Sequence, residues 1–221
     1  RSRAWPRLAA ARTAFQVRCE DTIPRTVSVL TAKRSGYTVD NTLSVRSLTM
    51  MKGSPRASQV VLGLTRFESR VAVGLNGPIL DDPASGHECV APQIAVELSY
   101  VPVVIFIGRE FVPGSCAYRE ILAHEMRHLD AYLAHMPKVE ATVRAALARR
   151  FDARPLYAPA GQARTLLARE IDSGWMPYIK RELARSELAQ AAIDSPREYE
   201  RLSKVCKGEV QSLIGKAQRT K

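Results

Sequence analysis

A long segment without glycine most constrains how this chain can fold. Residues 117–151 contain no glycine and a single proline, Pro137. Ser115 follows Pro113-Gly114 and is a suitable N-cap residue, so a helix is expected to begin directly after it. We expect Pro137 to kink or divide this helix, because proline lacks the N–H that an interior helical residue donates.

This segment contains the pattern His124-Glu125-Met126-Arg127-His128. On a helix, His128 lies about 40° from His124 and one turn further on, so both imidazoles project from one face and can bind the same metal ion. Glu125 lies beside them, where a carboxylate can take a proton from a metal-bound water. The pattern therefore predicts a metal site that can activate water.

The surroundings of the pattern favour a metal site over two ordinary core histidines. The sector of the helix that carries the histidines also carries apolar residues, which indicates that the pattern faces the protein interior. These residues are Ile121, Tyr132, Val139 and Val143. The alternative is two buried histidines that hydrogen-bond to the backbone, with Glu125 in a salt bridge.

The pentapeptide resembles the active-site helix of the zincin metallopeptidases. The resemblance implies that His124 and His128 bind one zinc ion per chain and that Glu125 is the general base of peptide-bond hydrolysis. The apolar segment 101–107 resembles the edge strand that lines the zincin substrate cleft. The order of a β-rich half, a cysteine and the motif helix is similar to that of small secreted bacterial zinc proteases.

Two features depart from the zincin pattern. Arg127 stands where the family usually has an uncharged residue, but it lies about 300° from His124, away from the apolar sector, and can stay solvated. The extended pattern with a third histidine is absent, because residues 129–132 contain no glycine. His135 would lie about 10 Å along the axis from His128, so we expect it not to be a ligand.

A third ligand must come from another segment, because a catalytic zinc normally has three protein ligands and one water. If the next helix packs antiparallel on the motif helix, equal counting from the loop at 155–161 places residues 182–187 opposite the motif. Glu182 lies on the apolar face of that helix, where an unpaired carboxylate would be costly. We therefore predict Glu182 as the third ligand. The alternatives are Glu187, Glu170, Asp172, Asp194, or a plain salt bridge from Glu182 to Lys180, Arg181 or Arg185.

The remainder of the chain predicts an α+β protein, with an N-terminal antiparallel β-sheet packed on a helical C-terminal half. Apolar–polar alternation and Val/Ile-rich runs predict strands before the motif helix, and residues 81–87 are expected to form a loop. Ser195-Pro196-Arg197-Glu198 has the form of a capping box and predicts a last helix. The predicted strands are 26–30, 37–48, 59–64, 70–75 and 94–107, and a bent helical region is expected at 162–193. We divide the chain into a basic lead-in (1–25), a β-rich half (26–112) and a helical half (113–221) within one domain.

The formal net charge of +11 and the pI near 9.9 suggest an anionic neighbour such as a cell-envelope polymer, or simply a solvated basic surface. No alternation of aromatic and basic residues supports RNA recognition, so a nucleic-acid partner rests on charge alone. We expect no transmembrane segment, because no apolar run approaches the roughly eighteen residues that a span needs.

The four cysteines are Cys19, Cys89, Cys116 and Cys206, and none forms a CxxC pair. This spacing argues against a cysteine zinc site and suits two disulfides, although four buried thiols would also fit. We predict the pairs Cys89–Cys116 and Cys19–Cys206 and a periplasmic or secreted protein. Because the sequence begins with arginine, we expect it to be a processed form.

Taken together, these features predict zinc-dependent hydrolysis of a peptide or protein substrate. The alternatives are a zincin-like binding protein without catalytic activity, and a basic module that binds the cell envelope or nucleic acid.

Overall fold

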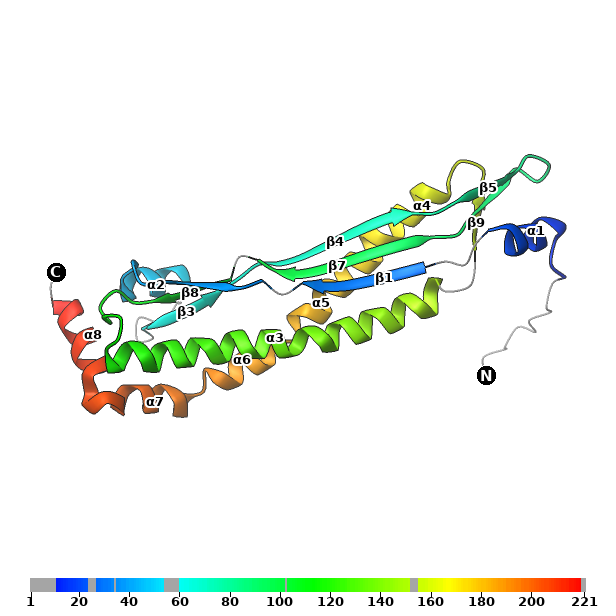
Figure 1. The fold of residues 1–221 in the computed structure, drawn as a ribbon. Helices are drawn as coiled ribbons and strands as arrows, with labels where there is room; N and C mark the ends of the chain where they lie inside the picture. Colours follow the sequence, from blue (N-terminus) through cyan, green and yellow to red (C-terminus); the bar gives the residue numbers. More distant parts are fainter. Residues whose placement is uncertain are drawn as a thin grey trace, which may run out of the picture. The chain divides into compact units, whose positions relative to one another are not determined.

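The structure, a computed structural model, describes residues 11–23, 27–33, 35–53, 60–101, 103–151 and 155–219. Most strands precede the long helix α3 and most helices follow it, which confirms the predicted α+β class (Figure 1). Residues 1–10 of the predicted lead-in and the strand residues Thr26 and Gln59 lie outside the described residues. Within the described part of the chain, no helix is long and apolar enough to cross a membrane.

The strands form three sheets with the orders β1-β7-β4, β2-β8-β3 and β5-β6-β9. The pairs β3–β8, β5–β6 and β6–β9 are antiparallel, as predicted, whereas β2 and β8 are parallel. The strands are β1 (Val27–Lys33), β2 (Tyr37–Asp40), β3 (Gly63–Arg66), β4 (Ser69–Asn76), β5 (Ile79–Asp82), β6 (His87–Val90), β7 (Gln93–Tyr100), β8 (Val103–Ile107) and β9 (Leu156–Pro159).

The helices include one long element and several short ones. They are α1 (Ala14–Thr22), α2 (Val45–Met51), α3 (Cys116–Phe151), α4 (Ala163–Glu170), α5 (Met176–Ala184), α6 (Glu187–Ile193), α7 (Pro196–Lys204) and α8 (Glu209–Arg219). A π-helix (Ile171–Trp175) joins α4 to α5, and a 3-10 turn (Val205–Gly208) joins α7 to α8. The bend expected within residues 162–193 therefore takes the form of a wider helical turn at Ile171–Trp175.

Helix α3 begins where the sequence predicts. The Ser115 hydroxyl oxygen accepts the N–H of Tyr118 at 3.2 Å, which confirms Ser115 as the cap. The helix then runs for 36 residues and continues through Pro137, so the expected division does not occur. Met136 and Val139 on either side of the proline are 1% exposed. Their burial stabilises the turn that has lost one hydrogen bond.

One strand assignment and one loop assignment from the sequence were wrong. Residues 37–48 form β2 followed by α2, because the Asp40 carboxylate accepts the N–H and the hydroxyl of Thr42 and turns the chain. Ser44 then caps α2 by accepting the N–H of Ser47 at 3.1 Å. Residues 81–87 form no simple loop, since they contain the end of β5 and the start of β6, joined by a tight turn with Gly86 at φ 66°.

The described residues group into two compact units, and each unit draws on both the β-rich and the helical part of the sequence. Unit 1 lies within Arg1–Val29, Val73–Val96 and Arg144–Pro177. Unit 2 lies within Leu30–Ala72, Glu97–Val143 and Tyr178–Lys221. The unit boundaries fall inside β1, β4, β7, α3 and α5, so residues of each of these elements belong to both units.

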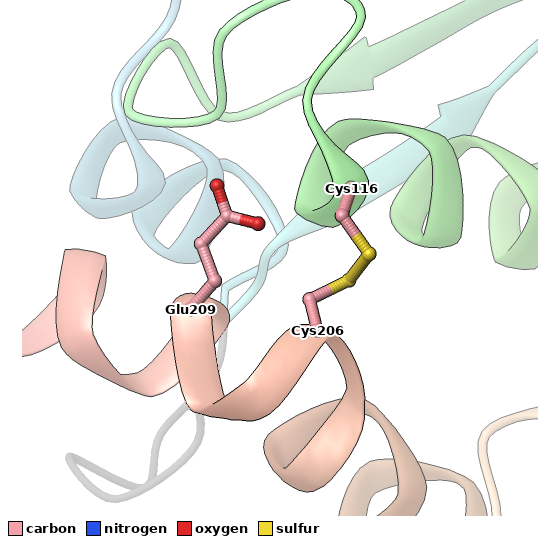
Figure 2. Close-up of side chains that lie close together, drawn as sticks. All are labelled: Cys116, Cys206 and Glu209. Atoms are coloured by element: carbon pink, nitrogen blue, oxygen red, sulfur yellow. A yellow bond between two sulfur atoms is a disulfide. The ribbon is translucent and has the colours of Figure 1, made fainter.

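Both predicted disulfide pairs were wrong. The structure joins Cys19 to Cys89 in unit 1 and Cys116 to Cys206 in unit 2. In unit 1, α1 packs its buried Phe15 and Cys19 on the Cys89 region of β6, which brings the first pair together. In unit 2, the chain after α7 returns to the start of α3, and Figure 2 shows the resulting bond.

A carboxylate from β6 caps helix α4 in unit 1. Gln162, the N-cap residue of α4, makes no side-chain cap hydrogen bond. Instead, the buried Glu88 accepts the N–H of Ala163 at 2.5 Å and the N–H of Gly161 at 2.8 Å. The Ala163 hydrogen bond is the main reason that the pKa of Glu88 lies below its ordinary value, although burial acts in the opposite direction. Glu88 thus supplies the cap that the local sequence lacks.

We expect Glu88→Gln to lower the free energy of unfolding at pH 7 by about 1–2 kcal/mol, because a neutral amide replaces a charged cap. The folded state lowers the pKa of Glu88, so its contribution is present above the unfolded pKa of about 4.3 and is lost as the pH falls through the folded value. Urea unfolding at pH 7 and near pH 3 should show a smaller difference at the lower pH. The exposed carboxylate Glu20, changed to Gln, is the control, and an equal effect of both changes would contradict this role.

Candidate metal centre

Three side chains of unit 2 point their ligand atoms at a common point. His124 and His128 lie one turn apart on α3, and Asp194 follows α6 as its C-cap residue. The two Nε2 atoms are 3.2 Å apart, and Oδ1 of Asp194 lies 3.2 Å from Nε2 of His124 and 3.1 Å from Nε2 of His128. Both histidines are buried, and these three residues form a group that could hold a metal ion.

The other nitrogen of each histidine has its own partner. Nδ1 of His124 lies 3.2 Å from Oε1 of Glu198, and Nδ1 of His128 lies 2.5 Å from Oε1 of Gln190. The Gln190 amide also donates to the main-chain oxygen of His128 at 3.2 Å, which fixes the amide orientation. The Gln190 oxygen can only accept, so Nδ1 of His128 donates to it, and Nε2 is the nitrogen of this ring that faces the common point. Nδ1 of His124 lies within reach of both the Glu198 carboxylate and, at 3.0 Å, the Arg127 guanidinium, and its Nε2 also faces the common point.

Charged neighbours keep Asp194 and Glu198 ionised. Burial alone would raise the pKa of Asp194, but hydrogen bonds with His124 and His128 and the charge of Lys52 hold it well below its ordinary value. Nζ of Lys52 lies 3.1 Å from Oδ2 of Asp194, so Oδ1 alone faces the histidines. The pKa of Glu198 is lowered to about 2, mainly by its hydrogen bonds with Arg201.

Arg127 has a different role from the one that its helix position suggests. Its side chain is 47% exposed, in line with the prediction, yet its guanidinium also pairs with the Glu198 carboxylate. Arg201 binds the same carboxylate at 2.9 and 3.0 Å and reaches Glu120 on α3 at 2.7 Å. The charged residue inside the motif therefore helps to hold the carboxylate that orients His124.

Glu125 lies beside the two histidines in a close contact with strand β3. Its Oε2 accepts the hydroxyl of Thr65 at 2.9 Å, and a Cβ at Gly63 would lie only 2.8 Å from Glu125 Cγ. The carboxylate is 4% exposed, and this burial is the main cause that raises its pKa.

Strand β8, at residues 103–107, is the centre of its sheet, so β3 takes the edge position that the sequence suggested for 101–107.

A cleft of about 160 Å³ opens beside these residues. Its lining includes His124, Glu125, His128, Asp194, residues 61–65, Lys52, Tyr132, Glu187 and Tyr199. Tyr199 on α7 interacts with Asp194, and burial together with the Asp194 charge raises the pKa of the phenol to about 12. Lys52 and Tyr199 were not predicted from the sequence. Lys52 contacts a side chain that lies far away in the sequence, and Tyr199 contacts one that lies across a helix break.

Glu182, the predicted third ligand, is not brought to the histidines. It is buried in α5, and its carboxylate pairs with Arg185 at 3.1 Å, which was the alternative reading. His135 does not belong to the group of possible ligands, and its Nε2 hydrogen-bonds to the main-chain oxygen of Glu182 at 2.8 Å. Equal counting from the loop at 155–161 did not find the third ligand, because β9, the π-helix and the break after Ala184 change which residues lie opposite the motif. Asp194, named as an alternative, is the carboxylate that joins the two histidines.

A second cluster of potential ligands has another explanation. Cys116, Cys206 and Glu209 lie close together, as Figure 2 shows, but the two sulfur atoms form a disulfide. The Glu209 carboxylate accepts the N–H of Ala117 at 3.1 Å and so caps the start of α3. The disulfide and this hydrogen bond attach α8 and the end of α7 to α3, the helix that carries the motif.

The chain matches no protein-family model, no curated protein and no solved structure in the comparisons that we made. The interpretation of the centre therefore depends on its geometry and on the chemistry of its residues.

We expect Asp194→Ala to lower zinc affinity by at least about 100-fold, because it removes one of three ligand atoms. Glu182→Gln, which removes the charge of the rejected candidate, should leave affinity within about twofold of the wild type. Competition titration with a chromophoric chelator measures both. Strong zinc binding by Asp194→Ala, or its loss in Glu182→Gln, would contradict the assignment.

The disulfide Cys116–Cys206 is expected to support metal binding. Cys116 lies about two turns before His124 on α3, and Cys206 follows the helix that carries Glu198. Changing both cysteines to serine should lower zinc affinity roughly tenfold, within the range typical of residues that orient ligands. The matched change of Cys19 and Cys89 in unit 1 should lower stability by about 2–4 kcal/mol and leave zinc affinity unaltered. Equal effects of the two double variants on zinc affinity would contradict this role.

Proposed function

We propose that the protein is a zinc-dependent peptidase in which His124, His128 and Asp194 hold the metal and Glu125 is the general base. The observation that carries the proposal is the convergence of the two Nε2 atoms and Oδ1 at mutual distances of 3.1–3.2 Å. Ligand atoms of a tetrahedral zinc with bonds of about 2.0–2.1 Å lie about 3.3 Å apart. Two neutral imidazoles and one carboxylate are also a donor set that leaves a fourth position for water, as in catalytic zinc sites.

The buried Glu125 supplies the proton transfers that hydrolysis needs. When bound, zinc would polarise the substrate carbonyl and acidify a water molecule. The Glu125 carboxylate accepts the water proton and delivers it to the leaving amine. Burial raises the pKa of Glu125, which favours holding the proton between these two events. The Thr65 hydroxyl donates to Oε2 and orients the carboxylate for the transfer.

Tyr199 is suited to stabilise the oxyanion that develops on the substrate carbonyl. It lines the cleft on the side of Asp194 and is about one-third exposed. Its pKa of about 12 keeps the phenol protonated at neutral pH, so it can donate a hydrogen bond.

Strand β3 offers a way to bind an extended peptide. It is one of the two edge strands of the sheet β2-β8-β3, and its residues Gly63, Leu64 and Thr65 line the cleft. A peptide can add to such an edge through main-chain hydrogen bonds. The two disulfides favour a periplasmic or secreted protein, and the net charge of +11 favours work near an anionic cell envelope.

We expect Glu125→Gln to keep one zinc per chain and to lower kcat/KM for peptide cleavage by about 10²–10⁴-fold, the usual contribution of general acid–base catalysis. Elemental analysis measures the zinc, and mass spectrometry of a broad peptide mixture measures cleavage. Removing zinc with a chelator should abolish cleavage, and returning it should restore cleavage. Glu97→Gln, an exposed carboxylate outside the cleft lining, is the control. A zinc-loaded wild type that cleaves nothing in the mixture would contradict the proposal.

A further inference from the structure

A buried tyrosine that packs against Tyr132 of the cleft lining has a hydroxyl without a partner among the described residues. Tyr100, the last residue of β7, is 4% exposed. Within the described part of the chain, its hydroxyl has no hydrogen-bond partner. Buried tyrosine hydroxyls usually find a partner, because an unpaired polar atom in the interior is costly. This hydroxyl is therefore suited to a group that the chain itself does not supply.

The carboxylate of Glu187 interacts with the tyrosines of this cluster. Glu187, the first residue of α6, lines the cleft, and Tyr132 donates its hydroxyl to Glu187 Oε1 at 3.4 Å. The pKa of Tyr100 is raised to about 12, first by burial and then by the charge of Glu187. The same two causes raise the pKa of Tyr132. Among the described residues, Glu187 forms no ion pair, so its charge is available to a ligand.

The tyrosine that contacts this carboxylate, Tyr132, belongs to a cluster of three aromatic rings. The ring centroids of Tyr100 and Tyr132 are 5.8 Å apart, and Phe67 packs edge-on against Tyr100 at 4.7 Å and against Tyr132. Aromatic faces attract cations, and the attraction adds to that of a nearby carboxylate. Tyr132 lies one helical turn after His128, so this cluster is adjacent to the metal centre.

We propose that Phe67, Tyr100, Tyr132 and Glu187 form a cation subsite that selects substrates with a positively charged group close to the scissile bond. The Glu187 carboxylate and the Tyr100 oxygen accept hydrogen bonds from that group, and the rings cover its alkyl stem. The group is an ammonium or guanidinium, which a lysine or arginine side chain or a free peptide N-terminus can provide. This inference rests on the proposed function, because it assumes that a peptide occupies the cleft.

The test compares peptides that differ in one charge. Zinc-loaded protein is offered octapeptides with blocked ends in which lysine, or its uncharged analogue norleucine, occupies each position in turn. At one position we expect lysine to raise kcat/KM by about tenfold, the size of one favourable buried charge contact. A second set with free N-termini separates the two sources of the cation, since a preference confined to it assigns the subsite to the α-ammonium group.

Variants assign the preference to the cluster. Glu187→Gln should reduce the lysine preference, measured as the ratio of kcat/KM for the lysine and norleucine peptides, to about twofold or less, and Glu187→Lys should reverse the preference. Tyr100→Phe keeps the ring and removes only the unpartnered hydroxyl, so it should reduce the preference in part. Glu97→Gln is the control. A preference that survives Glu187→Gln, or equal rates for lysine and norleucine at every position, would overturn the subsite.

Binding separates this inference from the proposed function. Fluorescence anisotropy with the zinc-loaded Glu125→Gln variant measures affinity for the same peptides without turnover. Tighter binding of the lysine peptide, lost when Glu187→Gln is added, supports the subsite even if the wild type cleaves no peptide. Cleavage without any preference in rate or binding would overturn the subsite and leave the peptidase proposal standing.

Discussion

The hydrogen bonds at the Nδ1 atoms of His124 and His128 decide what this site can do. They hold both rings so that the Nε2 atoms converge with Asp194 on one point. The acceptors, Glu198 and Gln190, lie on α7 and α6, whereas the histidines lie on α3. The centre therefore exists only when these helices pack on α3, and the ion pairs of Glu198 and the Cys116–Cys206 disulfide stabilise that packing.

The charges around the centre differ from those of the chain as a whole. The protein carries a net charge of +11, yet Glu125, Glu187 and Asp194 all line the cleft. Among the described residues that line it, the only lysine is Lys52, which is already paired with Asp194. A locally acidic cleft with two buried imidazoles suits a divalent cation and a cationic substrate group, while the basic remainder of the surface suits an anionic environment.

The parts of the fold that depend on local sequence could be predicted, and the parts that depend on distant contacts could not. The helical spacing of His124 and His128 and the caps Ser115 and Ser195 involve residues a few positions apart, and the structure has them as expected. Asp194, the carboxylate that joins the two histidines, comes in the sequence after a π-helix and a break between two helices. Neither interruption could be recognised from the spacing of the apolar residues. The predicted disulfide pairs were wrong for the same reason, because the pairing of the cysteines follows from the packing of distant segments.

The most direct test of the account is X-ray absorption spectroscopy at the zinc edge of the zinc-loaded protein. The account predicts a first shell of nitrogen and oxygen at about 2.0–2.1 Å, multiple-scattering features of two imidazoles and no sulfur. Both imidazole features should be lost together when His124 and His128 are changed to alanine. A sulfur shell near 2.3 Å, or a single imidazole, would contradict the assignment of His124, His128 and Asp194 as the metal ligands.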